Sequence, residues 1–238
     1  MSNYKLSPVN QLLRTLPIEE YQRLAPHLRE LVLVSGQVLH EPYEEIKSVY
    51  FPITAMISLV SIMENGSTTE IGLIGNEGMI GLPIFLGGEY TISRAIVQMS
   101  GKSWKISSDI VLREFKKAGA LQKILLLHTQ ARLTQIAQSA ACNRQHKIEA
   151  RLARWLLSVY DCVLKDELDL TQEFISNMLG VRRAGVTIAA NALQDAGIIR
   201  YNRGKIVILD HKKLEETSCE CYRVVQKEFL RLLGSRRG

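Results

Sequence analysis

The sequence predicts an α+β protein made of an N-terminal β jelly roll, a long dimerisation helix and a C-terminal winged helix-turn-helix. Residues 31–106 alternate short apolar runs with glycine-containing turns, which is typical of many short antiparallel strands. Residues 109–143 contain no proline and a single glycine, which favours a long helix. Residues 170–209 have the pattern of two short helices followed by a hairpin. The expected domain boundaries are residues 1–108, 109–145 and 146–238, the last including a C-terminal helix.

Composition limits the class of protein. Hydrophobic residues make up 46% of the 238 residues, which is enough for packed cores, and no apolar run reaches the roughly 20 residues of a membrane span. The N-terminus lacks the apolar region of a signal peptide, and four cysteines are too few for a disulfide scaffold, so we expect a cytoplasmic protein. The sequence contains no phosphate-binding loop, dinucleotide fingerprint or nucleophile motif, so we expect no enzyme activity.

The front of the chain is rich in strand-forming residues. A helical opening over residues 10–28 comes first, and the apolar runs after it are separated by glycines such as Gly36, Gly66 and Gly75. We expect strands at residues 31–34, 37–40, 48–51, 55–63, 68–74, 92–99 and 101–106. Strands of this number and spacing fold into a sandwich or a jelly roll.

The long helix carries an apolar seam. Its members are Leu126, Leu133, Ala137 and Ala140. They recur at steps of seven, four and three residues, which is the spacing of a helix–helix contact. The length of the helix and its apolar character favour a dimer interface, and the alternative is that it packs on its own roll. A second helix over residues 148–163 then leads into the last domain.

Residue types in the last domain predict a helix-turn-helix. Thr171 is a good N-cap, and Glu173 places a negative charge at the positive end of the first helix. Gly180 follows the last apolar residue, where a left-handed backbone ends helices. The second helix begins near Arg182. In a helix-turn-helix this second helix enters the major groove of DNA.

Basic charge is concentrated in the same domain. From residue 170 onward there are 12 Lys and Arg against 7 Asp and Glu, whereas the preceding residues carry 18 against 17. Arg182 and Arg183 open the second helix, where side chains reach base edges or phosphates. Arg203 and Lys205 lie at the hairpin tip, a natural position for contacts with the DNA backbone. The alternatives are a solvated basic surface and a winged helix that binds a protein.

This order of parts resembles the Crp/Fnr family of bacterial transcription regulators over nearly the whole chain. The resemblance is strongest in residues 171–199 and in the roll segment IGLIGNEGMIGLPIFLGG at residues 71–88. It implies a cyclic-nucleotide-binding-like roll and a homodimer that binds a near-palindromic promoter site on double-stranded DNA. It also implies RNA polymerase and a small-molecule effector as partners.

Only part of the family's DNA-reading pattern is present. Family members often carry an Arg-Glu pair followed four residues later by another Arg, and alignment through Gly180 matches the first Arg to Arg183. The two other positions hold Ala184 and Ile188. Thr171 matches a helix-capping position that can contact phosphate. The expected DNA-binding residues are Thr171, Arg182, Arg183, Thr187, Asn191, Arg203 and Lys205.

The family's nucleotide-binding signature is altered as well. Its cyclic-AMP binders hold the ribose with a Gly-Glu pair and the cyclic phosphate with an Arg-Ser-Ala run. Here Gly81 is followed by Leu82, and the later run is Ser93-Arg94-Ala95, with its first two residues exchanged. A shift of one residue along a strand turns a side chain to the opposite face, so ordinary cyclic-AMP binding is not expected. The candidate effector residues are Glu77, Gly81, Leu82, Ser93, Arg94 and His128, the last because family effectors usually touch the long helix.

The sequence identifies no cofactor and no effector. The first 141 residues contain no cysteine, so the thiolates of the family's oxygen-sensing iron–sulfur cluster are missing. Cys219 and Cys221 are two residues apart in the predicted tail helix and should point in different directions, so we expect ordinary thiols and no metal site. A DNA-binding transcription regulator is favoured. The alternative is a signalling adaptor of the same architecture whose winged helix binds a protein partner.

Overall fold

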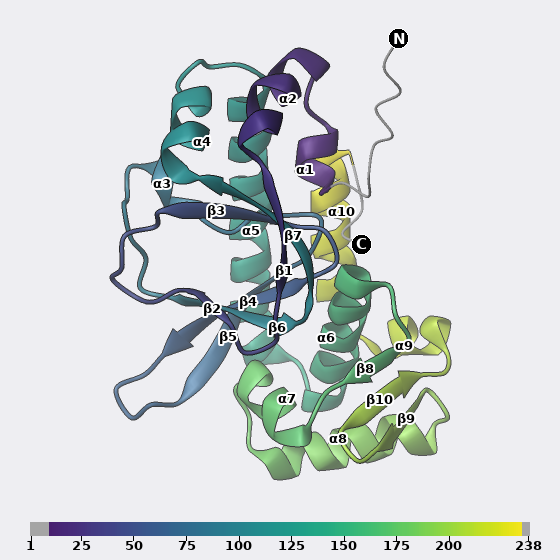
Figure 1. Ribbon diagram of the computed structural model, residues 1–238. Coiled ribbons are helices and arrows are strands. Elements are labelled where there is room, and N and C mark those ends of the chain that lie inside the picture. Colours follow the sequence, from purple (N-terminus) through teal and green to yellow (C-terminus); the bar gives the residue numbers. More distant parts are fainter. Residues whose placement is uncertain (1–9, 235–238) are drawn as a thin grey trace.

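The computed structural model describes residues 10–234 as a β-roll joined by a long helix to a smaller, mostly helical domain (Figure 1). The roll consists of two antiparallel sheets, with strand orders β1-β7-β3 and β2-β6-β4-β5. Its strands are β1 (Arg29–Leu33), β2 (Val38–His40), β3 (Ser48–Pro52), β4 (Met56–Ile62), β5 (Thr68–Ile74), β6 (Arg94–Met99) and β7 (Gly101–Ser107). All seven predicted strands are confirmed, and each strand begins and ends within two residues of its predicted position.

The interior of the roll is apolar. Both sheets contribute to one cluster of buried side chains, namely Leu33, Tyr50, Ala55, Ile57, Ile74, Ile80, Ala95 and Val97. Short helices cover the end of the roll: α1 (Gln11–Arg14), α2 (Ile18–Leu24), the 3-10 turn η1 (Ala25–His27) and α3 (Pro83–Leu86). A second apolar cluster joins these helices to β3 and to the start of the long helix.

The predicted long helix is divided in two, so the prediction of one helix from residue 109 is wrong at its start. Helix α4 (Ser108–Phe115) ends before a turn in which Ala118 adopts φ 57°. Helix α5 (Ala120–Gln145) then begins against α2, where the carboxylate of Glu20 accepts the backbone N–H groups of Ala120 and Leu121, each at 2.8 Å. A residue 100 positions earlier in the chain therefore caps the long helix.

The C-terminal domain contains the predicted winged helix-turn-helix. Its elements are α6 (Ile148–Val163), β8 (Glu167–Asp169), α7 (Gln172–Leu179), α8 (Arg183–Asp195), β9 (Ile199–Asn202), β10 (Lys205–Ile208), α9 (His211–Thr217) and α10 (Cys221–Leu233). The wing has three strands in the order β8-β10-β9, and the sequence interpretation had missed β8. Within residues 10–234, no helix has the length and hydropathy needed to cross a membrane.

Two contacts fix this domain against the rest of the chain. The apolar cluster of α6, α7 and α8 continues into Met56, Val60 and Leu73 of the roll. Helix α10 lies along α5, where Val225 and Phe229 pack against Ala131 (Figure 1). Since α10 begins at Cys221, Cys219 precedes the helix, and the prediction that both cysteines lie on one helix is wrong.

Candidate DNA interface and sensor residues

The helix-turn-helix is set by local hydrogen bonds. The Thr171 hydroxyl accepts the N–H of Phe174 at 3.1 Å and caps α7, as its residue type predicts. Gly180 ends α7 with φ 62°, a left-handed conformation that favours glycine. Arg182 occupies the N-cap position of α8, and Arg183 is the first helical residue. The two arginines therefore stand at the end of α8 where the helix dipole is positive and anions are favoured.

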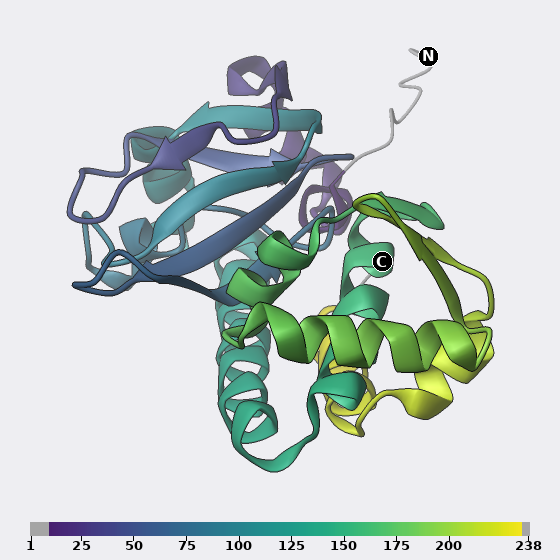
Figure 2. The same cartoon turned by 90° about the horizontal axis from the view of Figure 1, so that it is seen from below.

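Helix α8 has one buried face and one face open to solvent. Its inner side consists of Val186, Ala189, Ala190 and Leu193, all predicted to lie there. Its outer side consists of Arg183, Ala184, Thr187, Ile188 and Asn191. The Ile188 side chain is 72% exposed, which is unusual for a large apolar residue in the middle of a helix. Figure 2 shows α8 lying across the outer surface of the domain, beside the wing.

Gln172 organises this face and was not predicted. Its Oε1 atom accepts a hydrogen bond from Thr187 Oγ1 at 3.0 Å and a longer one from Arg183 Nε at 3.5 Å. It also lines a surface hollow with Thr171, Arg183, Tyr201, Arg203 and Gly204. Four expected DNA-binding residues therefore lie around this side chain, namely Thr171, Arg183, Thr187 and Arg203.

The two predicted cations of the wing differ, because Arg203 is exposed and Lys205 forms an ion pair. Arg203 (φ 48°) and Gly204 (φ 81°) form the two-residue turn of the hairpin, both in the left-handed region, and Arg203 is exposed. Lys205 instead forms an ion pair with Glu167 of β8, with its Nζ 2.7 Å from Oε1. This hydrogen bond raises the pKa of Lys205 and lowers that of Glu167. Strand β8, which was not predicted from the sequence, therefore pairs with Lys205, one of the residues expected to contact phosphate.

The six candidate effector residues do not converge on one site. Arg94 opens β6, and its guanidinium Nε lies 2.7 Å from the Glu41 carboxylate. Ser93 is buried next to it and shares a hydrogen bond with Thr91 at 3.1 Å. Arg94 is the first residue of β6 and Ser93 directly precedes it, whereas Glu77, Gly81 and Leu82 lie between β5 and α3 and His128 lies in α5.

The other candidates have structural roles. Glu77 is buried and accepts the N–H of Gly75 at 2.9 Å, which closes a turn. Gly81 adopts φ 114°, and a Cβ there would meet the Val49 side chain at 3.1 Å, so both its backbone and its packing require glycine. Leu82 precedes α3 as its N-cap residue. None of these features requires a ligand.

His128 is one of the buried polar residues of α5, together with Arg132 and Gln135. It is fully buried, and neither ring nitrogen has a hydrogen-bond partner within residues 10–234. Burial and, to a smaller extent, the charge of Arg132 lower the pKa of His128 to about 3. A Cβ on Gly78 would lie 3.0 Å from its Nε2 atom, so the roll backbone packs directly against the ring.

The predicted seam of α5 is open to solvent. Leu126 is 46% exposed, Leu133 is 63% exposed, and Ile136 beside them is 41% exposed. Ala137 and Ala140 are exposed on the same helix. The seam therefore does not pack on the roll of its own chain, which was the alternative considered from the sequence.

A family comparison identifies the last domain. Residues 150–217 match the model of the Crp-like helix-turn-helix domain. These residues form a Crp-like helix-turn-helix domain. The match contains all of α7, α8, α9 and the wing. No curated protein sequence matches the chain.

Solved structures of the same fold include transcription regulators of the Crp/Fnr family. A family member from Eubacterium rectale is 19% identical, with a TM-score of 0.68 over 87% of this chain and 96% of that chain. FixK2 from Bradyrhizobium japonicum is 15% identical, with a TM-score of 0.69 over 81% and 98%. CLP from Xanthomonas campestris, a c-di-GMP-responsive global regulator, is 13% identical, with a TM-score of 0.66 over 81% and 99%. The chain therefore shares the fold of these regulators, and its last domain matches the Crp-like helix-turn-helix domain.

Proposed function

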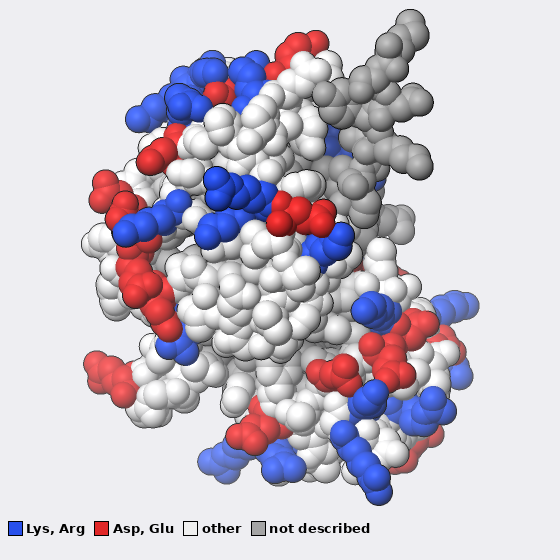
Figure 3. All heavy atoms as spheres, in the orientation of Figure 1, with Lys and Arg blue, Asp and Glu red and all other residues white. Residues whose placement is uncertain are grey.

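We propose that the chain is a homodimeric transcription regulator that reads a near-palindromic DNA site with α8 and receives its signal in the roll. The observation that carries this proposal is the outer face of α8, where Arg183, Thr187 and Ile188 lie together beside the basic wing. Lys and Arg side chains project along the edge of the molecule where α7, α8 and the wing lie (Figure 3). A positive edge of this kind suits the phosphate backbone of DNA.

Each side chain on this face has a chemical counterpart in DNA. The planar fork of Arg183 matches the O6 and N7 acceptors of guanine, and the exposed Ile188 suits the methyl group of thymine. Asn191 can read adenine, although it lies further from the start of the helix. Thr171 and Arg182 precede their helices and are placed for phosphate contacts, which position the protein without reading sequence.

The exposed seam of α5 supports the dimer. An apolar stripe left uncovered within one chain is stabilised when a second copy covers it. A two-fold pair would present two copies of α8 to half-sites about one helical turn of DNA, roughly 34 Å, apart. RNA polymerase is the further partner expected of a regulator bound at a promoter.

The roll supports a signal other than cyclic AMP bound in the family's usual way. Its interior is filled by apolar side chains, and Arg94 is already paired with Glu41. CLP, which has the same fold, responds to a different nucleotide, c-di-GMP. In this proposal the residues up to 108 sense the signal, residues 109–145 transmit it, and residues 146–238 bind DNA.

Selection of binding sites from random DNA tests the proposal. We expect Arg183→Ala to lose about 1–3 kcal/mol per half-site and to relax preference at one guanine-containing base pair. Arg183→Lys should keep non-specific affinity better than specificity, and Arg182→Ala should weaken all sites alike. Arg113→Ala on α4, whose side chain is 62% exposed, is the matched control and should change nothing.

Two outcomes would contradict these roles. If Arg183→Ala keeps the wild-type consensus while Arg182→Ala loses a base, the helix is rotated in the groove and the two roles are exchanged. If no consensus is selected and residual DNA binding does not weaken with salt, the winged helix serves a protein partner as an adaptor would.

A further inference from the structure

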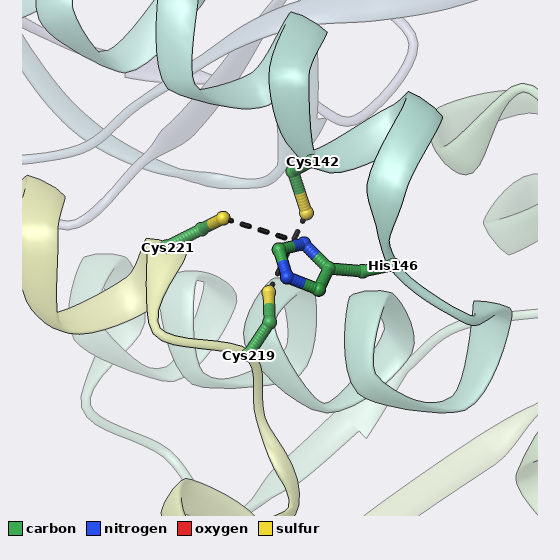
Figure 4. A group of neighbouring side chains, drawn as sticks. All are labelled: Cys142, His146, Cys219 and Cys221. Atoms are coloured by element: carbon green, nitrogen blue, oxygen red, sulfur yellow. Dashed lines mark hydrogen bonds between the residues drawn. The ribbon is translucent and has the colours of Figure 1, made fainter.

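Four side chains with metal-binding atoms gather where α5 ends. They are Cys142, His146, Cys219 and Cys221, here called the Cys3His cluster. The three sulfur atoms and an imidazole nitrogen all lie within 4.8 Å of one another. In Figure 4 these side chains point toward a common centre. The cluster contains none of the expected DNA-binding residues and none of the candidate effector residues.

Two separate segments build the cluster. Cys142 and His146 are four residues apart at the C-terminal end of α5, which places both on one face of the helix. Cys219 lies in the connection between α9 and α10, and Cys221 is the first residue of α10. Because Cys219 lies before the helix, the two thiols face the same way, although a helix would have separated them. The three cysteine side chains are buried.

The spacing fits one tetrahedral metal ion. With Zn–S bonds near 2.3 Å, two thiolates on a tetrahedral Zn²⁺ lie about 3.8 Å apart. Cys142 Sγ and Cys219 Sγ are 3.4 Å apart, and Cys221 Sγ is 3.6 Å from His146 Nδ1. An iron–sulfur cluster distributes its protein ligands over several iron atoms and needs a wider arrangement. The compact spacing therefore favours a single ion.

Neighbouring residues orient these ligands. Glu220 Oε2 lies 3.1 Å from His146 Nε2, whereas Cys221 Sγ lies 3.6 Å from the other ring nitrogen, Nδ1. A carboxylate in this position keeps the proton on Nε2 and leaves Nδ1 as the metal ligand, as in carboxylate–histidine–zinc triads. Gln138 Nε2 donates to Cys221 Sγ at 3.1 Å, which stabilises a thiolate. The positive charges of Arg151 and Arg154 also act on Cys142, and they would offset part of the negative charge of three thiolates.

We propose that the Cys3His cluster binds one Zn²⁺ ion in tetrahedral geometry and that this ion fastens the end of α5 to the start of α10. Three thiolates and one imidazole form a common closed set of structural zinc ligands, with no coordination position left for catalysis. The ion would lie beside the two-residue connection, His146 and Lys147, through which the chain passes from α5 into α6. It would therefore hold the arrangement of the long helix and the DNA-binding domain.

Metal content of the purified full-length chain tests the proposal directly. The protein is prepared with reductant and without chelator, and zinc, iron and acid-labile sulfide are measured per chain. We expect about one zinc per chain, without iron or sulfide. Removal of zinc and titration with Co²⁺ should give the visible absorption of tetrahedral cobalt together with thiolate-to-cobalt charge transfer, at one equivalent.

Variants separate the cluster from unspecific thiol binding. Cys142→Ser, Cys219→Ser and Cys221→Ser should each lose the stoichiometric ion, whereas His146→Cys should retain zinc in a four-thiolate site. Cys162→Ser is the matched control, because Cys162 is also buried but packs beside Gly75 of the roll, outside the cluster. Glu220→Ala should weaken zinc affinity by roughly 10- to 100-fold in competition with a chelating dye.

Three results would overturn the proposal. Wild-type protein that takes up no zinc or cobalt would show that the cluster is not a metal site, and this measurement needs no variant to fold. Stoichiometric iron and sulfide would mean an iron–sulfur cluster. A metal-free protein with a Cys142–Cys219 disulfide by mass spectrometry would identify a thiol redox pair.

Discussion

The exposed seam of α5 allows a quantitative test of the dimer. Fully burying a leucine side chain contributes about 1.5–3 kcal/mol, so covering the 63% of Leu133 that is exposed contributes about 1–2 kcal/mol. A two-fold interface uses this side chain twice. Leu133→Ala should therefore weaken the dimer by about 2–4 kcal/mol, which raises its dissociation constant roughly 30- to 1,000-fold.

Analytical ultracentrifugation over a range of protein concentrations measures this change. Ile92→Ala is the control, because Ile92 is 69% exposed but lies in the roll, away from α5. Leu133→Glu should be more severe, since each subunit would bring a charge into an apolar interface. A Leu133→Ala protein that dimerises as tightly as the wild type would show that the seam is elsewhere, and the proposed pairing of two α8 helices would have to be rebuilt.

Three further outcomes follow from the structure. Arg203→Ala should reduce the slope of log K against log salt by about one, whereas Lys205→Ala, whose ammonium is paired with Glu167, should change it little, as a salt titration of DNA binding will show. The pKa of His128 is lowered from its ordinary value of 6.5 to about 3 in the folded chain, so the unfolded chain binds more protons between these two pH values. The contribution of the neutral His128 to the free energy of unfolding is therefore complete above pH 6.5 and is lost as the pH falls toward 3. Chemical unfolding at pH 7.5 and 5.5 should show that His128→Gln loses less free energy of unfolding between the two pH values than the wild type does. An equal loss in both proteins would place the acid sensitivity elsewhere. Calorimetry should detect no micromolar cyclic-AMP binding, and tight binding that Arg94→Ala abolishes would show that the roll uses the family's site after all.

The sequence predicted the elements whose signals are local. Each strand of the roll is delimited by turn residues nearby, so all seven were found. The break between α4 and α5 was missed because its cause is distant: the helix starts where Glu20 of α2 supplies the cap. Strand β8 was missed for the same reason, since residues 167–169 become a strand only by pairing with residues 205–207.

The candidate sites follow the same division. The faces of α8 could be predicted because helical periodicity assigns every residue a direction. Gln172 was missed because its role depends on how α7 crosses α8, and Lys205 was assigned to DNA because its partner strand was unknown. A metal site at Cys219 and Cys221 was not expected because both residues were placed in one helix. The helix instead begins at Cys221, two residues after Cys219, which removes that geometric objection.

The junction at the end of α5 leads to a last prediction, which rests on the proposed zinc ion. Helix α6, which leads to the helix-turn-helix, begins at Ile148, directly after the turn that follows His146. An ion that holds this junction in the DNA-binding arrangement must, by linkage, bind more tightly when DNA is bound, and by the same factor as it tightens DNA. We expect a coupling of about 1–3 kcal/mol, or roughly 5- to 150-fold in each affinity. The DNA dissociation constant with and without zinc, and the zinc dissociation constant with and without the selected operator, give the two factors independently. A factor of one in both measurements would mean that the ion stabilises the contact between α5 and α10 without reaching α8.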